Sequence, residues 1–168
     1  MDTFTIRRET ESDISAIRDL TLRAFRDMPY SDQKESQIVE MLRDADALTF
    51  SLIAVKGASV VGHIAASPVS IEDGCEKWFG IGPISVDPDR QGAGIGSQLV
   101  ARALDELRSL DADGAVALGD PAFYRRFGFD RYEELTFPGV DQSYFLAIPL
   151  TDAAVPLGTV TYHQAFYL

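Results

Sequence analysis

The segment DPDRQGAGIGSQLVARAL, residues 87–104, has glycine at every second position, at 92, 94 and 96, directly before a long amphipathic pattern. Glycine in a helix interior costs about 0.5–1 kcal/mol relative to alanine, so three glycines here indicate a backbone that something approaches closely. The first N–H groups of a helix have no partner within it and carry the positive end of its dipole. Residues 91–97 are therefore predicted to form an anion cradle, most simply for phosphate. A tight strand-to-helix turn is the alternative, and it explains one glycine better than three.

The spacing of the glycines restricts the kind of phosphate ligand. A P-loop requires a lysine after its last glycine, and no lysine follows Lys77 in this chain. A dinucleotide fingerprint requires Gly-x-Gly-x-x-Gly and an acidic residue at the end of the next strand. Here the spacing is Gly-x-Gly-x-Gly, and Asp111 and Asp113 precede the next predicted strand. A nicotinamide-dependent enzyme is therefore the weaker alternative.

Length and composition set the class of protein. The 168 residues suit one domain spanning 1–168, and 46% hydrophobic residues are ordinary for a globular chain. No apolar run reaches about 18 residues and no signal segment opens the chain, so we expect no membrane span. A single cysteine favours a reducing compartment, and the cytoplasm is the expected location. The net charge of −11 argues against nucleic acid as a partner and mildly favours a cationic one such as an amine. With two histidines and one cysteine, no metal site is expected.

Hydrophobic periodicity predicts an α/β domain with a mixed sheet and the element order β-α-α-β-β-β-α-β-α-β-β. Helices are expected over residues 14–25, after a cap at Ser31, from residue 95 to about 108, and over 122–127. Strands are expected over residues 4–8, 48–55, 59–69, 77–86, 115–118, 144–150 and 158–166. Pro83 lies inside one of these strands, and because proline cannot donate to a ladder it predicts a bulge or a break in pairing.

Two stretches carry a resemblance to a known family. The stretch ISVDPDRQGAGIGSQLV contains the pattern Gln/Arg-x-x-Gly-x-Gly/Ala, met by Gln91, Gly94 and Gly96, and it resembles the acetyl-CoA motif of the GNAT superfamily of N-acetyltransferases. The stretch GDPAFYRRFGF, residues 119–129, resembles the second signature of that superfamily. It and the C-terminal Gly-x-Val-x-Tyr-His-x-Ala-Phe pattern are similar to the bacterial YhbS-like predicted acetyltransferases. The predicted element order matches the GNAT fold over nearly the whole chain.

The resemblance implies acetyl-CoA as co-substrate, with its pyrophosphate on the backbone amides of residues 91–96 and its pantetheine arm along residues 84–86. It also implies that the strand at 77–86 diverges from the next strand near Pro83, which leaves the Ile84 amide free to polarise the acetyl carbonyl. The residues expected to bind the cofactor are Ile84, Ser85, Val86, Arg90, Gln91, Gly92, Ala93, Gly94, Ile95, Gly96 and Ser97.

The resemblance further implies direct attack by a primary amine in a ternary complex, with Tyr124 as general acid. For the base it leaves Glu35, Asp120, His63 or a water molecule open. We expect no role for Cys75 and a strand position for His163. The acceptor is open among a small-molecule amine, a peptide N-terminus and a lysine, and a homodimer is possible. A non-catalytic CoA-binding regulator on the same fold is the alternative, since fold alone does not fix function.

Overall fold

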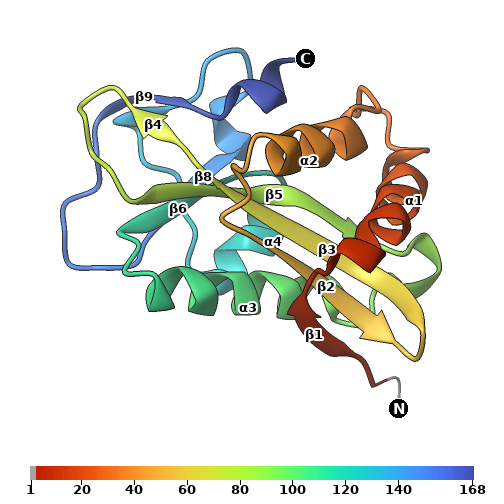
Figure 1. Ribbon diagram of the computed structural model, residues 1–168. Helices are drawn as coiled ribbons and strands as arrows, with labels where there is room; N and C mark the ends of the chain where they lie inside the picture. Colours follow the sequence, from red (N-terminus) through yellow and green to blue (C-terminus); the bar gives the residue numbers. More distant parts are fainter. Residues whose placement is uncertain (1–2) are drawn as a thin grey trace.

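The computed structural model describes residues 3–168 and contains a six-stranded mixed sheet in the order β1-β2-β3-β5-β6-β8 (Figure 1). Only β5 and β6 are parallel, and all other neighbours are antiparallel. The first strand lies at one edge of this sheet. The strands of this sheet are β1 (Thr5–Arg8), β2 (Phe50–Lys56), β3 (Ser59–Pro68), β5 (Trp78–Val86), β6 (Gly114–Leu118) and β8 (Phe145–Pro149).

Helices cover both faces of the sheet. Helix α3 (Ile95–Ser109) packs on one face, and α1 (Ile14–Phe25) and α2 (Glu35–Asp44) pack on the other (Figure 1). The alternation of side chains along β2 explains this arrangement. Leu52 and Ala54 join the core beneath α3, whereas Ile53 packs against α1 and α2. The predicted mixed α/β architecture is therefore confirmed. Across residues 3–168, no helix has the length and apolar character needed to cross a membrane.

A second sheet has three strands in the order β4-β9-β7. Its strands are β4 (Ser70–Ile71), β7 (Leu135–Thr136) and β9 (Gly158–Thr161). The sequence pattern did not predict β4 or β7. The prediction of a strand over 158–166 is wrong in its second half, where a 3-10 turn (Gln164–Tyr167) follows β9. His163 is therefore not a strand residue. Its Nδ1 accepts the N–H of Ala165 at 3.0 Å and caps the turn.

Two helix predictions also need correction. Ser31 does not cap α2, which begins at Glu35, because Gln33 has a φ of 65° that is incompatible with a helix. The Ser31 hydroxyl instead donates to the Glu35 carboxylate. The short helix expected over 122–127 is α4 (Pro121–Tyr124) followed by a 3-10 turn (Arg125–Phe127).

The parallel pair β5 and β6 separates part-way along its length. Pairing runs from Trp78–Gly114 to Gly80–Val116 and ends there, although both strands continue. Beyond that point β5 remains paired with β3, through a register irregularity next to Pro83, and β6 remains paired with β8. The predicted bulge at Pro83 is therefore confirmed, while the pairing of β5 with β6 ends earlier, at Gly80. The divergence leaves an opening in the middle of the sheet.

The closed end of this pair depends on a contact between Trp78 and Gly114. A Cβ added at Gly114 would lie 2.3–2.4 Å from three atoms of the Trp78 ring, which cannot move without disturbing the core. We expect Gly114→Ala to lower the free energy of unfolding by about 1–3 kcal/mol in urea denaturation. Gly96→Ala is the matched control, because its added Cβ meets nothing nearer than 3.6 Å. Equal stability of the two variants would contradict this account.

Candidate active site

Two cavities open where β5 and β6 diverge. One, here called the apolar cavity, has a volume of about 390 Å³, and the other, the glycine-loop cavity, about 610 Å³. They share part of their walls, to which β5, α4 and the segments that follow α1 and β6 contribute. The shared residues are Met28, Ile84, Asp120 and Phe123.

Most of the residues predicted to bind a cofactor line the glycine-loop cavity. These are Ile84, Val86, Gln91, Gly92, Gly94, Ile95, Gly96 and Ser97. Three others lie outside that lining. Ser85 is buried with its hydroxyl 3.5 Å from that of Thr21, Arg90 ends a 3-10 turn (Pro88–Arg90), and Ala93 is exposed in the loop.

The three glycines of the loop have different structural reasons. Gly92 and Gly94 have φ values of 84° and 83°, a conformation that favours glycine, and no atom lies within 4 Å of the position of an added Cβ. The turn itself therefore explains these two. Gly96 is helical, and an added Cβ would make ordinary contacts with Val86 at 3.6 Å and Phe123 at 3.7 Å. Neither backbone conformation nor packing requires glycine at 96.

The start of α3 presents hydrogen-bond donors to the glycine-loop cavity. The N–H of Gln98 donates to the Gly94 carbonyl at 3.1 Å and closes the first helical turn, so the amides of residues 95–97 lie ahead of that closure. Arg126 adds a positive charge to the lining; its guanidinium donates to the Ser97 hydroxyl at 3.2 Å and lies 5.0 Å from the Phe123 ring centroid. Amides, a helix dipole and a guanidinium together fit an anion.

Arg126 is not among the residues predicted from the sequence to bind the cofactor. The pair Arg125–Arg126 is too short to count as a basic surface, and only the fold brings the second arginine beside the glycine loop. Its position inside the GDPAFYRRFGF stretch was the signal in the sequence that could have identified it.

The free edge of β5 also presents donors. The N–H of Asp87 donates to the Val61 carbonyl of β3 at 2.9 Å. Because successive N–H groups alternate along a strand, the amides of Ile84 and Val86 point to the other side, where β6 has diverged. An extended ligand could pair with them as an added strand does.

Tyr124 lines the apolar cavity from α4. The carboxylate of Asp120 accepts the N–H of Ala122 at 2.9 Å and so fixes the start of this helix. The Tyr124 side chain is 4% exposed and contacts Phe123 and Phe129 edge-on, with ring centroids 5.0 and 5.3 Å away. Burial raises the pKa of Tyr124 to about 12. The phenol is therefore protonated at neutral pH and can donate a proton.

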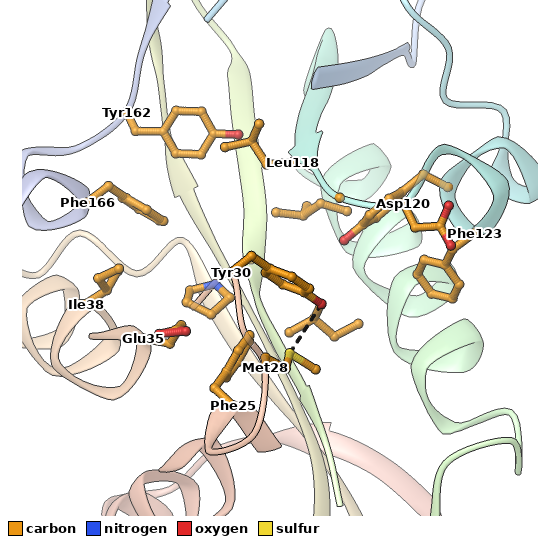
Figure 2. Close-up of a pocket in the computed structure, with 16 residues that line it drawn as sticks. Phe25, Met28, Tyr30, Glu35, Ile38, Leu118, Asp120, Phe123, Tyr162 and Phe166 are labelled. Carbon is orange, nitrogen blue, oxygen red and sulfur yellow. Dashed lines mark hydrogen bonds between the residues drawn. The ribbon is translucent and has the colours of Figure 1, made fainter. Parts of the chain in front are cut away.

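Among the candidates for the base, Glu35 and Asp120 line the apolar cavity, on opposite sides of it (Figure 2). His63 lies outside the lining of both cavities; it is fully buried, with Nε2 2.8 Å from the Ser51 hydroxyl. Cys75 is exposed and also outside both linings. Among the residues that the structure describes, no three histidine, cysteine or carboxylate side chains are grouped so as to hold a metal ion.

The model of the acetyltransferase (GNAT) family matches residues 14–129. The uncharacterised N-acetyltransferase YhbS of Escherichia coli K12 is 35% identical over 168 residues, covering 96% of this chain and 97% of YhbS. A GNAT family acetyltransferase from Brucella melitensis, solved in complex with acetyl-CoA, is 44% identical with a TM-score of 0.87, covering 99% of each chain. The structure of E. coli YhbS in complex with CoA is 33% identical with a TM-score of 0.89, covering 100% of this chain and 94% of that one.

These matches define an N-acetyltransferase fold and class. The chain belongs to the GNAT family, and the resemblance to YhbS-like proteins is confirmed.

The buried histidine gives a prediction for stability. Burial lowers the pKa of His63 to about 4, with Glu9 opposing and Arg43 reinforcing the shift. In the unfolded chain a histidine titrates near 6.5, so between pH 6.5 and 4 the unfolded state binds a proton that the folded state does not. We expect the free energy of unfolding to fall by on the order of 3 kcal/mol across that window.

Urea denaturation at several pH values measures this effect. His63→Gln removes the titrating group, and the fall between pH 6.5 and 4 should flatten. If that variant does not fold, NMR titration of the imidazole in the natural chain decides the question. Protonation of His63 near pH 6.5 in the folded protein would contradict the prediction.

Proposed function

We propose that this chain transfers the acetyl group of acetyl-CoA to a primary amine by direct attack in a ternary complex. The observation that carries the proposal is that two cavities meet at the divergence of β5 and β6, one lined by anion-binding donors and the other by a buried tyrosine and a carboxylate. The GNAT relatives solved with acetyl-CoA or CoA support the choice of cofactor. Family membership also favours it over a dinucleotide ligand.

The glycine-loop cavity fits the cofactor. The amides at the start of α3 and the guanidinium of Arg126 would hold the pyrophosphate, and the Val86 and Ile84 amides would hold the arm and the acetyl oxygen. The open space at Gly92 and Gly94 and the absence of a side chain at Gly96 leave room for phosphate against the backbone. Three of the predicted residues lie outside the lining of this cavity, namely Arg90, Ser85 and Ala93. They would help to position the loop and β5 rather than contact the cofactor.

When bound, acetyl-CoA supplies a thioester whose acyl carbon accepts the amine nitrogen as the C–S bond breaks. The Ile84 N–H would stabilise the developing negative charge on the acyl oxygen. Tyr124 holds a proton for the departing sulfur and regains one from solvent. Glu35, the carboxylate of the apolar cavity with an unpartnered oxygen, takes the proton that the amine loses.

Gly96→Ala tests the cradle. The added methyl meets only ordinary contacts and alanine favours a helix, so stability should be unchanged or up to about 1 kcal/mol higher. Acetyl-CoA should bind at least about tenfold more weakly, because the added methyl takes up space in the cavity between α3 and the lining residues Val86 and Phe123. Thermal unfolding with acetyl-CoA, CoA and NADH measures both effects. For the natural chain, a ligand at 100 times its Kd adds about 2.7 kcal/mol, or roughly 5–10 °C in Tm. A rise with NADH alone, or none with either CoA species, would overturn the proposal.

Tyr124→Phe separates an enzyme from a CoA-binding regulator. Loss of the proton donor should lower kcat by about 10²-fold or more, while the Tm rise with acetyl-CoA stays as in the natural chain. Release of CoA thiol reports the rate, in a Cys75→Ser background because Cys75 is exposed and reacts with thiol reagents. With the pKa of Tyr124 near 12, the kcat of the natural chain should not decline up to about pH 10 through loss of this proton. Equal kcat for Tyr124→Phe would exclude the acid role.

A further inference from the structure

The walls of the apolar cavity restrict the acceptor more closely than membership of the family does. Besides glycine and proline, the lining is aliphatic or aromatic with only two charged residues, both acidic. Its aromatic residues are Phe25, Tyr30, Phe123, Tyr124, Tyr162 and Phe166, and its acidic residues are Glu35 and Asp120. Its volume of about 390 Å³ lies in the range of small-molecule sites. An acceptor that fills it must bring apolar surface.

Glu35 supplies an uncompensated negative charge inside this apolar surface. One carboxylate oxygen accepts the Ser31 hydroxyl, and the other is buried with no hydrogen-bond partner among the described residues. Figure 2 shows the side chain on the side of the cavity formed by Phe25, Ile38 and Phe166. A buried, unpartnered carboxylate oxygen is costly, so a donor carried by a ligand has a strong reason to lie there.

The other acidic residue of the lining, Asp120, has different surroundings. Asp120 is exposed and its carboxylate accepts the Ala122 N–H at the start of α4. Water screens the charge of the exposed Asp120 carboxylate, so the buried carboxylate oxygen without a partner among the described residues is that of Glu35, which matches one ammonium group rather than two. No Lys, Arg or His is among the lining residues, so a carboxylate or phosphate on the acceptor would find no partner.

Tyr162 adds a neutral polar group. It comes from the C-terminal Gly-x-Val-x-Tyr-His-x-Ala-Phe pattern, is 6% exposed, and its hydroxyl has no partner among the described residues. Burial raises the pKa of Tyr162, so the hydroxyl stays uncharged. A neutral hydroxyl does not require a second charged group on the ligand. The rings of Tyr162 and Phe166 pack edge to face and form an aromatic wall of the cavity (Figure 2).

We propose that the acceptor is a primary monoamine with an apolar body of aromatic size and no anionic group, and that its ammonium enters the cavity on Glu35. This inference rests on the proposed acetyltransferase function and names the substrate class for the same site. The ammonium gives one proton to the Glu35 carboxylate before attack. Glu35 releases that proton to solvent, and the nitrogen loses its second proton to solvent after attack. The CoA sulfur takes a proton from Tyr124, which regains one from solvent.

The test compares three amines with acetyl-CoA in the natural chain: 2-phenylethylamine, phenylalanine and spermidine. Phenylalanine has the same body with a carboxylate, and spermidine has several ammonium groups without an apolar ring. We expect kcat/KM for 2-phenylethylamine to exceed that for either other amine at least tenfold. A preference for phenylalanine or spermidine, or no acetylation of any of the three, overturns the inference. If acetyl-CoA still raises Tm in that case, cofactor binding stands; if it does not, the proposed function fails as well.

Glu35→Gln tests the charge. We expect kcat/KM for 2-phenylethylamine to fall about tenfold to a hundredfold, because a hydrogen bond to a charged group is lost, while the Tm rise with acetyl-CoA is unchanged. Glu40→Gln is the matched control; it removes the same charge from α2, but Glu40 pairs with Arg18 and lies outside both cavities. An equal loss in both variants, or none in Glu35→Gln, overturns the role of Glu35.

Discussion

Beyond Gly80, β5 and β6 stop sharing hydrogen bonds, and the site depends on this separation. Each strand can leave the other because it has a second partner, β3 for β5 and β8 for β6, so neither loses its place in the sheet. The N–H groups of Ile84 and Val86 then face an opening instead of a neighbouring strand. The same divergence places the start of α4, with Asp120 and Phe123, over the gap and lets both cavities share one wall.

Local signals in the sequence predict much of this arrangement. The glycine spacing, the amphipathic period after it and the proline in the preceding strand each follow from the conformation of a few neighbouring residues. The short helix at Asp120 is equally readable, because an acid followed by proline is a strong start signal. The role of Tyr124 as general acid is predicted only from its place in the family motif. The neighbouring residues do not distinguish a tyrosine that packs in the core from one that donates a proton.

What the sequence did not predict depends on contacts between distant segments. Arg126 reaches the glycine loop, and Phe166 reaches the wall near Glu35, only through the fold. The departure of β9 to a second sheet is decided by its partners at Ser70–Ile71 and Leu135–Thr136, which are too short to show a period. The late start of α2 depends on the left-handed backbone conformation of Gln33, which cannot be predicted from the presence of a glutamine.

Met28, Ile84, Asp120 and Phe123 line both cavities. If an occupant of one cavity shifts any of these side chains, it changes the affinity of the other cavity. Thermodynamic linkage makes that change equal in both directions. The concentrations of the two ligands and their separate affinities would therefore decide which binary complex accumulates, while the free energy of forming a ternary complex would be the same by either route.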